Sequence, residues 1–253
     1  MTEPQMRSSG VEFREARRLR LVEVAAPRVS LEHRLAMDRV WDEAVEANPT
    51  GLFDGPVVVC TGVEWGAPES VVLFWTGVTY RRYALRRVPG AAAVSSLFVA
   101  VVQPTDDGGV LVGRMSSATA APGRVQFPGG SVEPPQEHES LDAAELRRQA
   151  ARELVEETGI DTVPEDLTLW VVTRGEHGNV GVFFRAPSRP ESVVRERFSA
   201  VVSAETALGR APELVEIAVV RSAAALACLD GPQVDYLEPL VRRYAEALLR
   251  RDA

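Results

Sequence analysis

Two stretches of the chain decide its fold: Pro-Gly-Gly-Ser-Val-Glu at residues 128–133 and Ala-Arg-Glu-Leu-Val-Glu-Glu-Thr-Gly-Ile at residues 151–160. Asp142 lies three residues before a Glu, which is the pattern of a capping box at the start of a helix. Gly159 followed by an apolar residue is a typical C-terminal stop. The sequence therefore predicts a helix over residues 143–158, behind a glycine-rich loop.

Three acidic residues, Glu153, Glu156 and Glu157, fall on one face of this helix. They lie in its last turns, where the negative end of the helix dipole and their mutual repulsion each cost roughly 0.3 to 1 kcal/mol. Such a conflict with local preference is typical of a functional site. Crowded carboxylates suit a hard divalent cation such as Mg²⁺, which prefers oxygen ligands. The alternative interpretation is an acidic face exposed to solvent.

The stretch from Arg152 to Ile160 resembles the second half of the signature of the Nudix hydrolases, and every fixed position of that half is matched. The first half departs from the signature. Gly130 and Arg152 are 22 positions apart (152 − 130), which is 8 more than the signature has. The enlarged loop leaves open which acid pairs with Arg152, and the nearest acids to the expected position are Glu137 and Glu145.

The resemblance implies a divalent metal cofactor, Mg²⁺ or Mn²⁺. Its implied ligands are Glu153, Glu156 and Glu157, together with the backbone carbonyl of Gly130 or its neighbour Gly129. Such an enzyme hydrolyses a P–O–P bridge in a nucleoside diphosphate that is linked to another moiety.

The resemblance also implies roles in the reaction itself. Glu153 is the default general base, and Arg152 would hold the carboxylates in place. A further ligand or base often follows the signature helix in these enzymes, and Glu213 is our candidate for it, with Glu216 as second choice. Both could equally be surface acids.

For substrate contacts we expect Arg114, Arg124 and Tyr80. Arginine enrichment is weak evidence here, because the chain has no Lys and all 28 of its basic residues are Arg. The segment 79–87 could bind a nucleotide through its tyrosines and arginines, or it could be an ordinary surface helix with tyrosines facing the core. His177 could be a base or a substrate contact, although a turn histidine is commonly exposed.

Short motifs outside the signature resemble one branch of the family, the UDP-glucose and UDP-galactose pyrophosphatases, which release UMP and a sugar 1-phosphate. They include Asn48-Pro49, Leu52-Phe53-Asp54-Gly55 and the run from Trp75 to Tyr80. The segment 123–130, which leads into the signature, also resembles the corresponding segment of the coenzyme A pyrophosphatases, although a His of their upstream motif is missing. The sequence is compatible as well with an ADP-ribose type enzyme and with a non-catalytic nucleotide-binding module. The clustered acids disfavour the module, and an isoprenoid isomerase would need a suitably placed Cys.

The expected fold is an α/β/α Nudix sandwich with a mixed β-sheet over residues 91–253, preceded by a small α+β extension over residues 1–90. In the extension, a helix beginning after Ser30 precedes two strands. The remaining expected segments are an edge strand near 19–24, strands at 57–63 and 71–75, a hairpin of 96–103 with 110–114, strands at 167–173, 180–185 and 217–220, and helices at 190–203, 222–229 and 233–250.

Composition bounds the remaining properties. A net charge of −8 argues against general nucleic-acid binding. The N-terminus is polar, and the longest weakly polar run, 91–102, is too short to cross a bilayer, so we expect no membrane partner. Two distant cysteines, Cys60 and Cys228, fit a reducing cytoplasm, and both are expected to be core thiols. The oligomeric state stays open.

Overall fold

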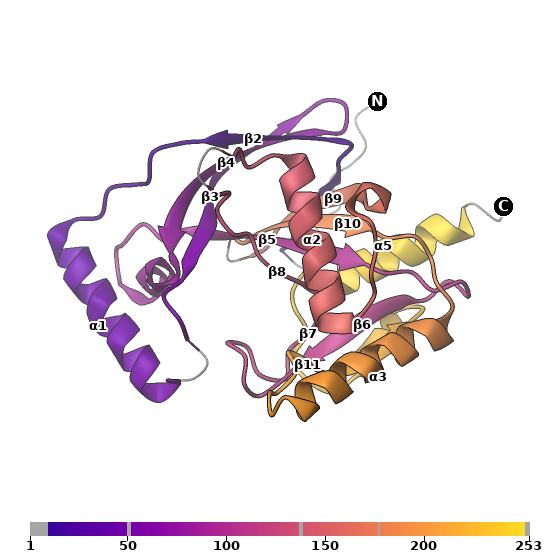
Figure 1. Ribbon diagram of the computed structural model, residues 1–253. Coiled ribbons are helices and arrows are strands. Elements are labelled where there is room, and N and C mark those ends of the chain that lie inside the picture. The colour runs from indigo at the N-terminus through magenta and orange to yellow at the C-terminus, as the bar shows by residue number, and fades with distance from the viewer. Residues whose placement is uncertain (1–9, 50–51, 137–138, 177, 251–253) are drawn as a thin grey trace.

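The computed structural model describes residues 10–49, 52–136, 139–176 and 178–250. An eight-stranded mixed sheet forms the centre, in the order β1-β9-β10-β5-β3-β4-β2, with β8 paired to β5 (Figure 1). A second, three-stranded sheet has the order β11-β6-β7. The strands are β1 (Glu12–Glu15), β2 (Arg18–Glu23), β3 (Pro56–Gly66), β4 (Ser70–Thr79), β5 (Ser95–Val102), β6 (Val110–Met115), β7 (Val125–Gln126), β8 (Gly129–Ser131), β9 (Thr168–Arg174), β10 (Val180–Arg185) and β11 (Leu214–Val220).

The helices confirm most of the predicted ones. They are α1 (Leu31–Ala47), α2 (Ala143–Thr158), α3 (Glu191–Ala207), α4 (Ala223–Ala227) and α5 (Leu237–Leu249), with short 3₁₀ helices η1 (Tyr80–Arg87) and η2 (Pro164–Asp166). None of the helices in the described ranges is both long and apolar enough to cross a membrane.

Helix α2 begins and ends where its caps predict. The Asp142 side chain accepts a hydrogen bond from the backbone N–H of Glu145 at 2.8 Å. At the other end, Gly159 adopts a left-handed conformation with φ of 71°, and its N–H donates to the carbonyl of Val155. A residue with a Cβ would be strained at that φ, so glycine ends the helix there.

Strand β5 lies at the centre of the core and has helices on both of its faces. Its residues Leu97, Val99 and Val101 pack into one cluster with residues of α2 and α3. The alternate residues Ala100 and Val102 pack into a second cluster with residues of α5. Because successive side chains of a strand point to opposite faces, this alternation places β5 in the middle layer of an α/β/α sandwich, as the sequence predicts.

The predicted hairpin is only partly correct. The turn forms, since the N–H of Thr105 donates to Gly109 and the N–H of Leu111 donates to Gln103. Beyond that point the two strands separate, because β5 pairs with β10, β3 and β8 while β6 pairs with β11 and β7. The single mixed sheet of the prediction is therefore divided into two.

The N-terminal segment contributes strands to both ends of the central sheet. Strand β1 pairs with β9 at one edge, and β3 pairs with β5 through Val59 opposite Ser96. Strand β2 lies at the other edge, parallel to β4, as expected for an edge strand. The sheet is thus continuous across residue 90, and a domain boundary there stays a prediction.

Helix α1 packs against η1 at one side of the molecule (Figure 1). Their contact forms a small cluster of its own around Met37, Leu85 and Val88. The two cysteines differ, because Cys60 is buried and Cys228 is exposed. The prediction of a core thiol is wrong for Cys228, which lies just past the end of α4 with its Sγ near a helix carbonyl.

Candidate functional site

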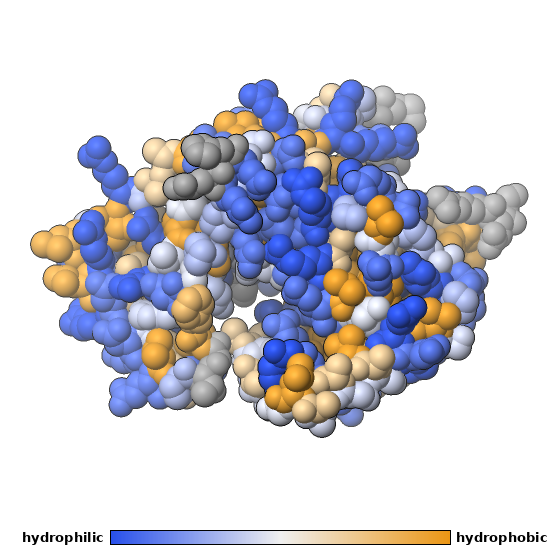
Figure 2. Space-filling model, in the orientation of Figure 1, coloured by the Kyte–Doolittle hydropathy of each residue, from blue (hydrophilic) through white to orange (hydrophobic). Residues whose placement is uncertain are grey.

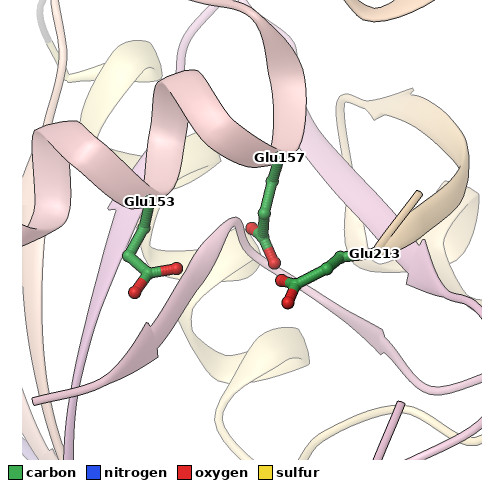
Figure 3. Close-up of side chains that lie close together, drawn as sticks. All are labelled: Glu153, Glu157 and Glu213. Carbon is green, nitrogen blue, oxygen red and sulfur yellow. The ribbon is translucent and has the colours of Figure 1, made fainter. Parts of the chain in front are cut away.

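Three carboxylates converge beside β8. Glu153 and Glu157 come from α2 and Glu213 from the residue before β11, and each offers one oxygen within 4.8 Å of the others. Figure 3 shows Glu157 and Glu213 pointing toward each other, with Glu153 one turn of the helix away. The structure therefore brings together three of the residues that the sequence assigns to metal binding and catalysis.

Glu157 is the innermost of the three, with 3% of its surface exposed. One of its oxygens accepts a hydrogen bond from the N–H of Gly129 at 2.8 Å. Burial raises the pKa of Glu157 well above its ordinary value, and the charges of Glu153 and Glu213 raise it further against the effect of the Gly129 hydrogen bond. The raised pKa of Glu157 indicates that no cation compensates the charge of this buried carboxylate.

Glu153 is half-buried on the preceding turn of α2. Burial, followed by the charges of Glu213 and Glu156, raises its pKa to about 7, although the Arg152 guanidinium acts in the opposite direction. Gly130 lies directly against this carboxylate, because a Cβ at that position would meet the Glu153 oxygens and come within 2.6 Å of its Cδ. The glycine thus allows the loop to approach the acid.

Gly129 is required for a different reason. Its φ is 154°, and an added Cβ would meet the carbonyl oxygen of Val99 and lie 2.6 Å from the Cα of Ala100. Both of those atoms belong to β5, with which Gly129 and Gly130 pair. The loop can therefore lie on the central strand only with glycine at this position.

The acid that pairs with Arg152 is Glu133, at 2.8 Å, and the spacing of the sequence does not reveal it. Of the two acids nearest to the expected position, Glu145 pairs with Arg148, and Glu137 lies outside the described residues. Glu133 is fixed by Gln149, whose side chain accepts a hydrogen bond from the Glu133 N–H at 3.0 Å and donates to its carbonyl at 3.1 Å. Gln149 lies one turn of α2 before Arg152. Helical periodicity could therefore have shown from the sequence that the two side chains lie on the same face.

Glu213 reaches the cluster from the second sheet. Its carbonyl accepts a hydrogen bond from the N–H of Ser116 at 2.7 Å, and the β11–β6 register shifts between Leu214 and Glu216. The second-choice acid, Glu216, pairs with Arg114 instead. The structure therefore favours the first choice, Glu213, as the acid near α2.

Two of the residues assigned from the sequence lie apart from the cluster. Glu156 is exposed and is not among the three converging carboxylates, although its charge contributes to the raised pKa of Glu153. Arg114 lines a separate, smaller pocket with its partner Glu216. The structure thus does not bring Arg114 to the acids.

A cleft of about 890 Å³ opens beside the acids and is lined by Glu157, Glu213, Gly129 and Gly130. Figure 2 shows the molecule hollowed between the part that carries α1 and the part that carries α2 and α3. Two of the expected substrate residues, Arg124 and Tyr80, line this cleft. The other residues of the N-terminal segment that line it are Leu52, Phe53, Tyr83 and Arg86. The candidate His177 lies outside the described residues.

The residues of the cluster fit a hard divalent cation. All three side chains offer carboxylate oxygens, the donor type that Mg²⁺ and Mn²⁺ take up. Throughout the described ranges, no ion pair is formed by Glu153, Glu157 or Glu213. A cation between them would relieve the repulsion that raises the pKa of both helix acids.

We expect the stability of the metal-free protein to fall as pH rises from about 4.5 to about 7. The pKa of Glu153 is raised to about 7 from 4.5, so the folded state binds more protons than the unfolded state in this window. Magnesium competes with those protons, so it should raise Tm more at pH 8 than at pH 5. Scanning calorimetry with and without Mg²⁺ measures both effects. A Glu153→Gln variant that shows the same pH dependence as wild type would contradict the assignment.

Comparison with known proteins places these residues in a family. The model of the NUDIX domain matches residues 96–243. Among solved structures, the MutT protein of Methanosarcina mazei Go1 is 22% identical over 62% of this chain and 95% of that one, with a TM-score of 0.36. The E. coli ORF135 protein is 21% identical over 62% of this chain and 92% of that one, with a TM-score of 0.38. No curated protein matches the chain.

Proposed function

Because the chain belongs to the Nudix family and is a hydrolase acting on pyrophosphate bonds, we propose that it cleaves a nucleoside diphosphate linked to a second group. The substrate that the sequence favours is a UDP-sugar, which would yield UMP and a sugar 1-phosphate. The observation that carries the proposal is the convergence of Glu153, Glu157 and Glu213, two of which, Glu157 and Glu213, line a large cleft. A nucleotide with an attached sugar requires a cleft of this kind beside its cation site.

Glu157 and Glu213 would hold the divalent cation, Mg²⁺ or Mn²⁺, together with Glu153. A backbone carbonyl of Gly129 or Gly130 is proposed to complete the set, whereas Glu156, a ligand that the family resemblance implies, lies apart from the three converging carboxylates. When bound, such a cation neutralises the charge of a diphosphate and makes water more acidic. The protein contributes rigidity, because Glu153 and Glu157 are fixed one turn apart on α2, and Glu157 is held by the Gly129 N–H.

Glu153 is the proposed general base. Its carboxylate lies beside Glu157 and Glu213, so it is placed to accept a proton from a water held at the cation site. The water oxygen then forms a bond to phosphorus as the P–O–P bond breaks, and the bridging oxygen leaves with the other phosphate. Arg152 would hold the end of α2 in place through its ion pair with Glu133. Positioning and charge stabilisation supply most of the rate enhancement in such reactions.

A panel of substrates tests the proposal. We expect purified protein with Mg²⁺ to release UMP from UDP-glucose or UDP-galactose, and chelation of the metal to stop the reaction. ADP-ribose, coenzyme A and a nucleoside triphosphate are run in parallel, with Glu153→Gln as the inactive control. Faster cleavage of coenzyme A or ADP-ribose would replace the UDP-sugar assignment. Tight binding of one compound without cleavage of any would instead favour a nucleotide-binding module.

A further inference from the structure

Arg86, which the proposed mechanism does not use, lies in the same cleft as the acids. It belongs to η1 in the N-terminal segment, and its guanidinium is held at three points. The Nε donates to the carbonyl of Val94 at 3.1 Å, one terminal nitrogen donates to the side chain of Asn179 at 2.8 Å, and the group lies 4.6 Å from the ring centre of Tyr83. The guanidinium is thus fixed in direction while some of its N–H groups remain free.

The charge of Arg86 has no compensating anion within the part of the chain that the structure describes. Both hydrogen-bond acceptors are neutral, and Arg86 takes part in no ion pair there. Burial lowers the pKa of Arg86, and only the nearby tyrosines Tyr83 and Tyr80 act in the opposite direction. Arg86 is exposed to solvent in the cleft, so an anion that enters the cleft can bind its fixed guanidinium in place of water.

The strand register relates Asn179, which holds Arg86, to the glycine loop beside the acids. On β5, Val99 pairs with Gly130 and Leu97 pairs with Val180, the residue after Asn179. Three residues along a strand and two strand spacings across it separate Asn179 from Gly130 by about 14 Å. A sugar or nucleoside attached to a phosphate can span such a distance. A substrate whose diphosphate lies at the acids would therefore bring its far end toward Arg86.

We propose that Arg86 binds an anionic group on the moiety that the diphosphate carries, so that the preferred substrate has a carboxylate or a phosphate there in addition to its diphosphate. This inference rests on the proposed function and narrows its substrate class. The oxygens of either group would accept hydrogen bonds from the free N–H groups of Arg86. Tyr83 acts as the platform under the guanidinium, and we assign its buried hydroxyl no contact with substrate.

Two matched pairs of compounds separate the sources of the anion. UDP-glucuronate differs from UDP-glucose by a carboxylate, and coenzyme A differs from dephospho-coenzyme A by a phosphate. We expect wild type to prefer the anionic member of one pair by about tenfold to a hundredfold in kcat/KM, the usual effect of a hydrogen bond to a charged group. Arg86→Gln should lower kcat/KM for that member far more than for its neutral counterpart, so the preference should shrink toward one.

Arg87→Gln is the matched control, because Arg87 is an exposed neighbour on η1 that is not among the residues lining the cleft. It should keep the wild-type preference. Equal kcat/KM within both pairs, an unchanged preference in Arg86→Gln, or the same loss in Arg87→Gln would overturn the proposal.

The proposal remains testable if none of the four compounds is cleaved. In that case the proposed substrate class fails, and dissociation constants measured by calorimetry with Mg²⁺ decide the role of Arg86 independently. Tighter binding of an anionic member by wild type, lost in Arg86→Gln, would support the subsite. Equal dissociation constants within each pair would refute it.

Discussion

Replacing Glu157 with Gln is expected to lower kcat by about a thousandfold or more and to leave the fold intact. The substitution removes one negative charge from the proposed cation site, whose charge stabilisation is worth several kcal/mol. The Gln side chain retains a carbonyl oxygen that can accept the hydrogen bond from Gly129, so the loop should stay in place. Steady-state kinetics at saturating Mg²⁺ and circular dichroism measure the two properties.

The same substitution should have the opposite effect on metal-free stability. Glu157 is buried and its pKa is raised, so neutral Gln removes a penalty that the folded protein carries at neutral pH. Tm without metal should therefore rise while activity is lost. The control is Glu196→Gln, an exposed acid on α3, which should change neither quantity. A Glu157→Gln variant with more than a tenth of the wild-type kcat would contradict the assigned role.

We expect Gly129→Ala to impair mainly stability and Gly130→Ala to impair mainly activity. At Gly129 the added methyl group meets the backbone of β5 at Val99 and Ala100, which cannot move away without breaking the sheet. We expect a loss of about 3 kcal/mol in the free energy of unfolding, or roughly 10 °C in Tm. Thermal and urea unfolding measure this loss directly.

At Gly130 the methyl group meets the carboxylate of Glu153, a flexible side chain that can turn aside. Tm should then change by only a few degrees, whereas a displaced base should lower kcat by about a hundredfold. Each variant serves as the control for the other. Equal losses of Tm in both variants, with equal residual kcat, would show that the two glycines do not divide their roles in this way.

The parts that the sequence predicts well are those set by local chemistry. The capping pattern at Asp142 and the stop at Gly159 fix the bounds of α2, and helical spacing then brings Glu153 and Glu157 to one side. The turn between β5 and β6 is also local, and it forms as predicted. In each case, the local structure is determined by residues only a few positions apart in the sequence.

The parts that the sequence misses depend on partners far along the chain. Strands β5 and β6 separate because β6 pairs with β11, which comes about a hundred residues later, and local spacing cannot reveal that partner. The position of Arg114 outside the cleft is missed for the same reason, since its carboxylate partner Glu216 lies opposite it on β11. Glu133 is missed as the partner of Arg152 because the enlarged loop changes the spacing of the signature. The hydrogen bonds between Glu133 and Gln149 span this loop, so the sequence spacing does not reveal them either.

The unequal environments of the two cysteines have a practical consequence for spectroscopy. Burial raises the pKa of Cys60 to about 11, so this thiol resists alkylation in the folded protein. Cys228 is exposed and lies in the small pocket beside Arg114 rather than among the residues of the large cleft. A maleimide dye therefore attaches to the natural chain at one place, beside the second sheet, while the large cleft stays unmodified.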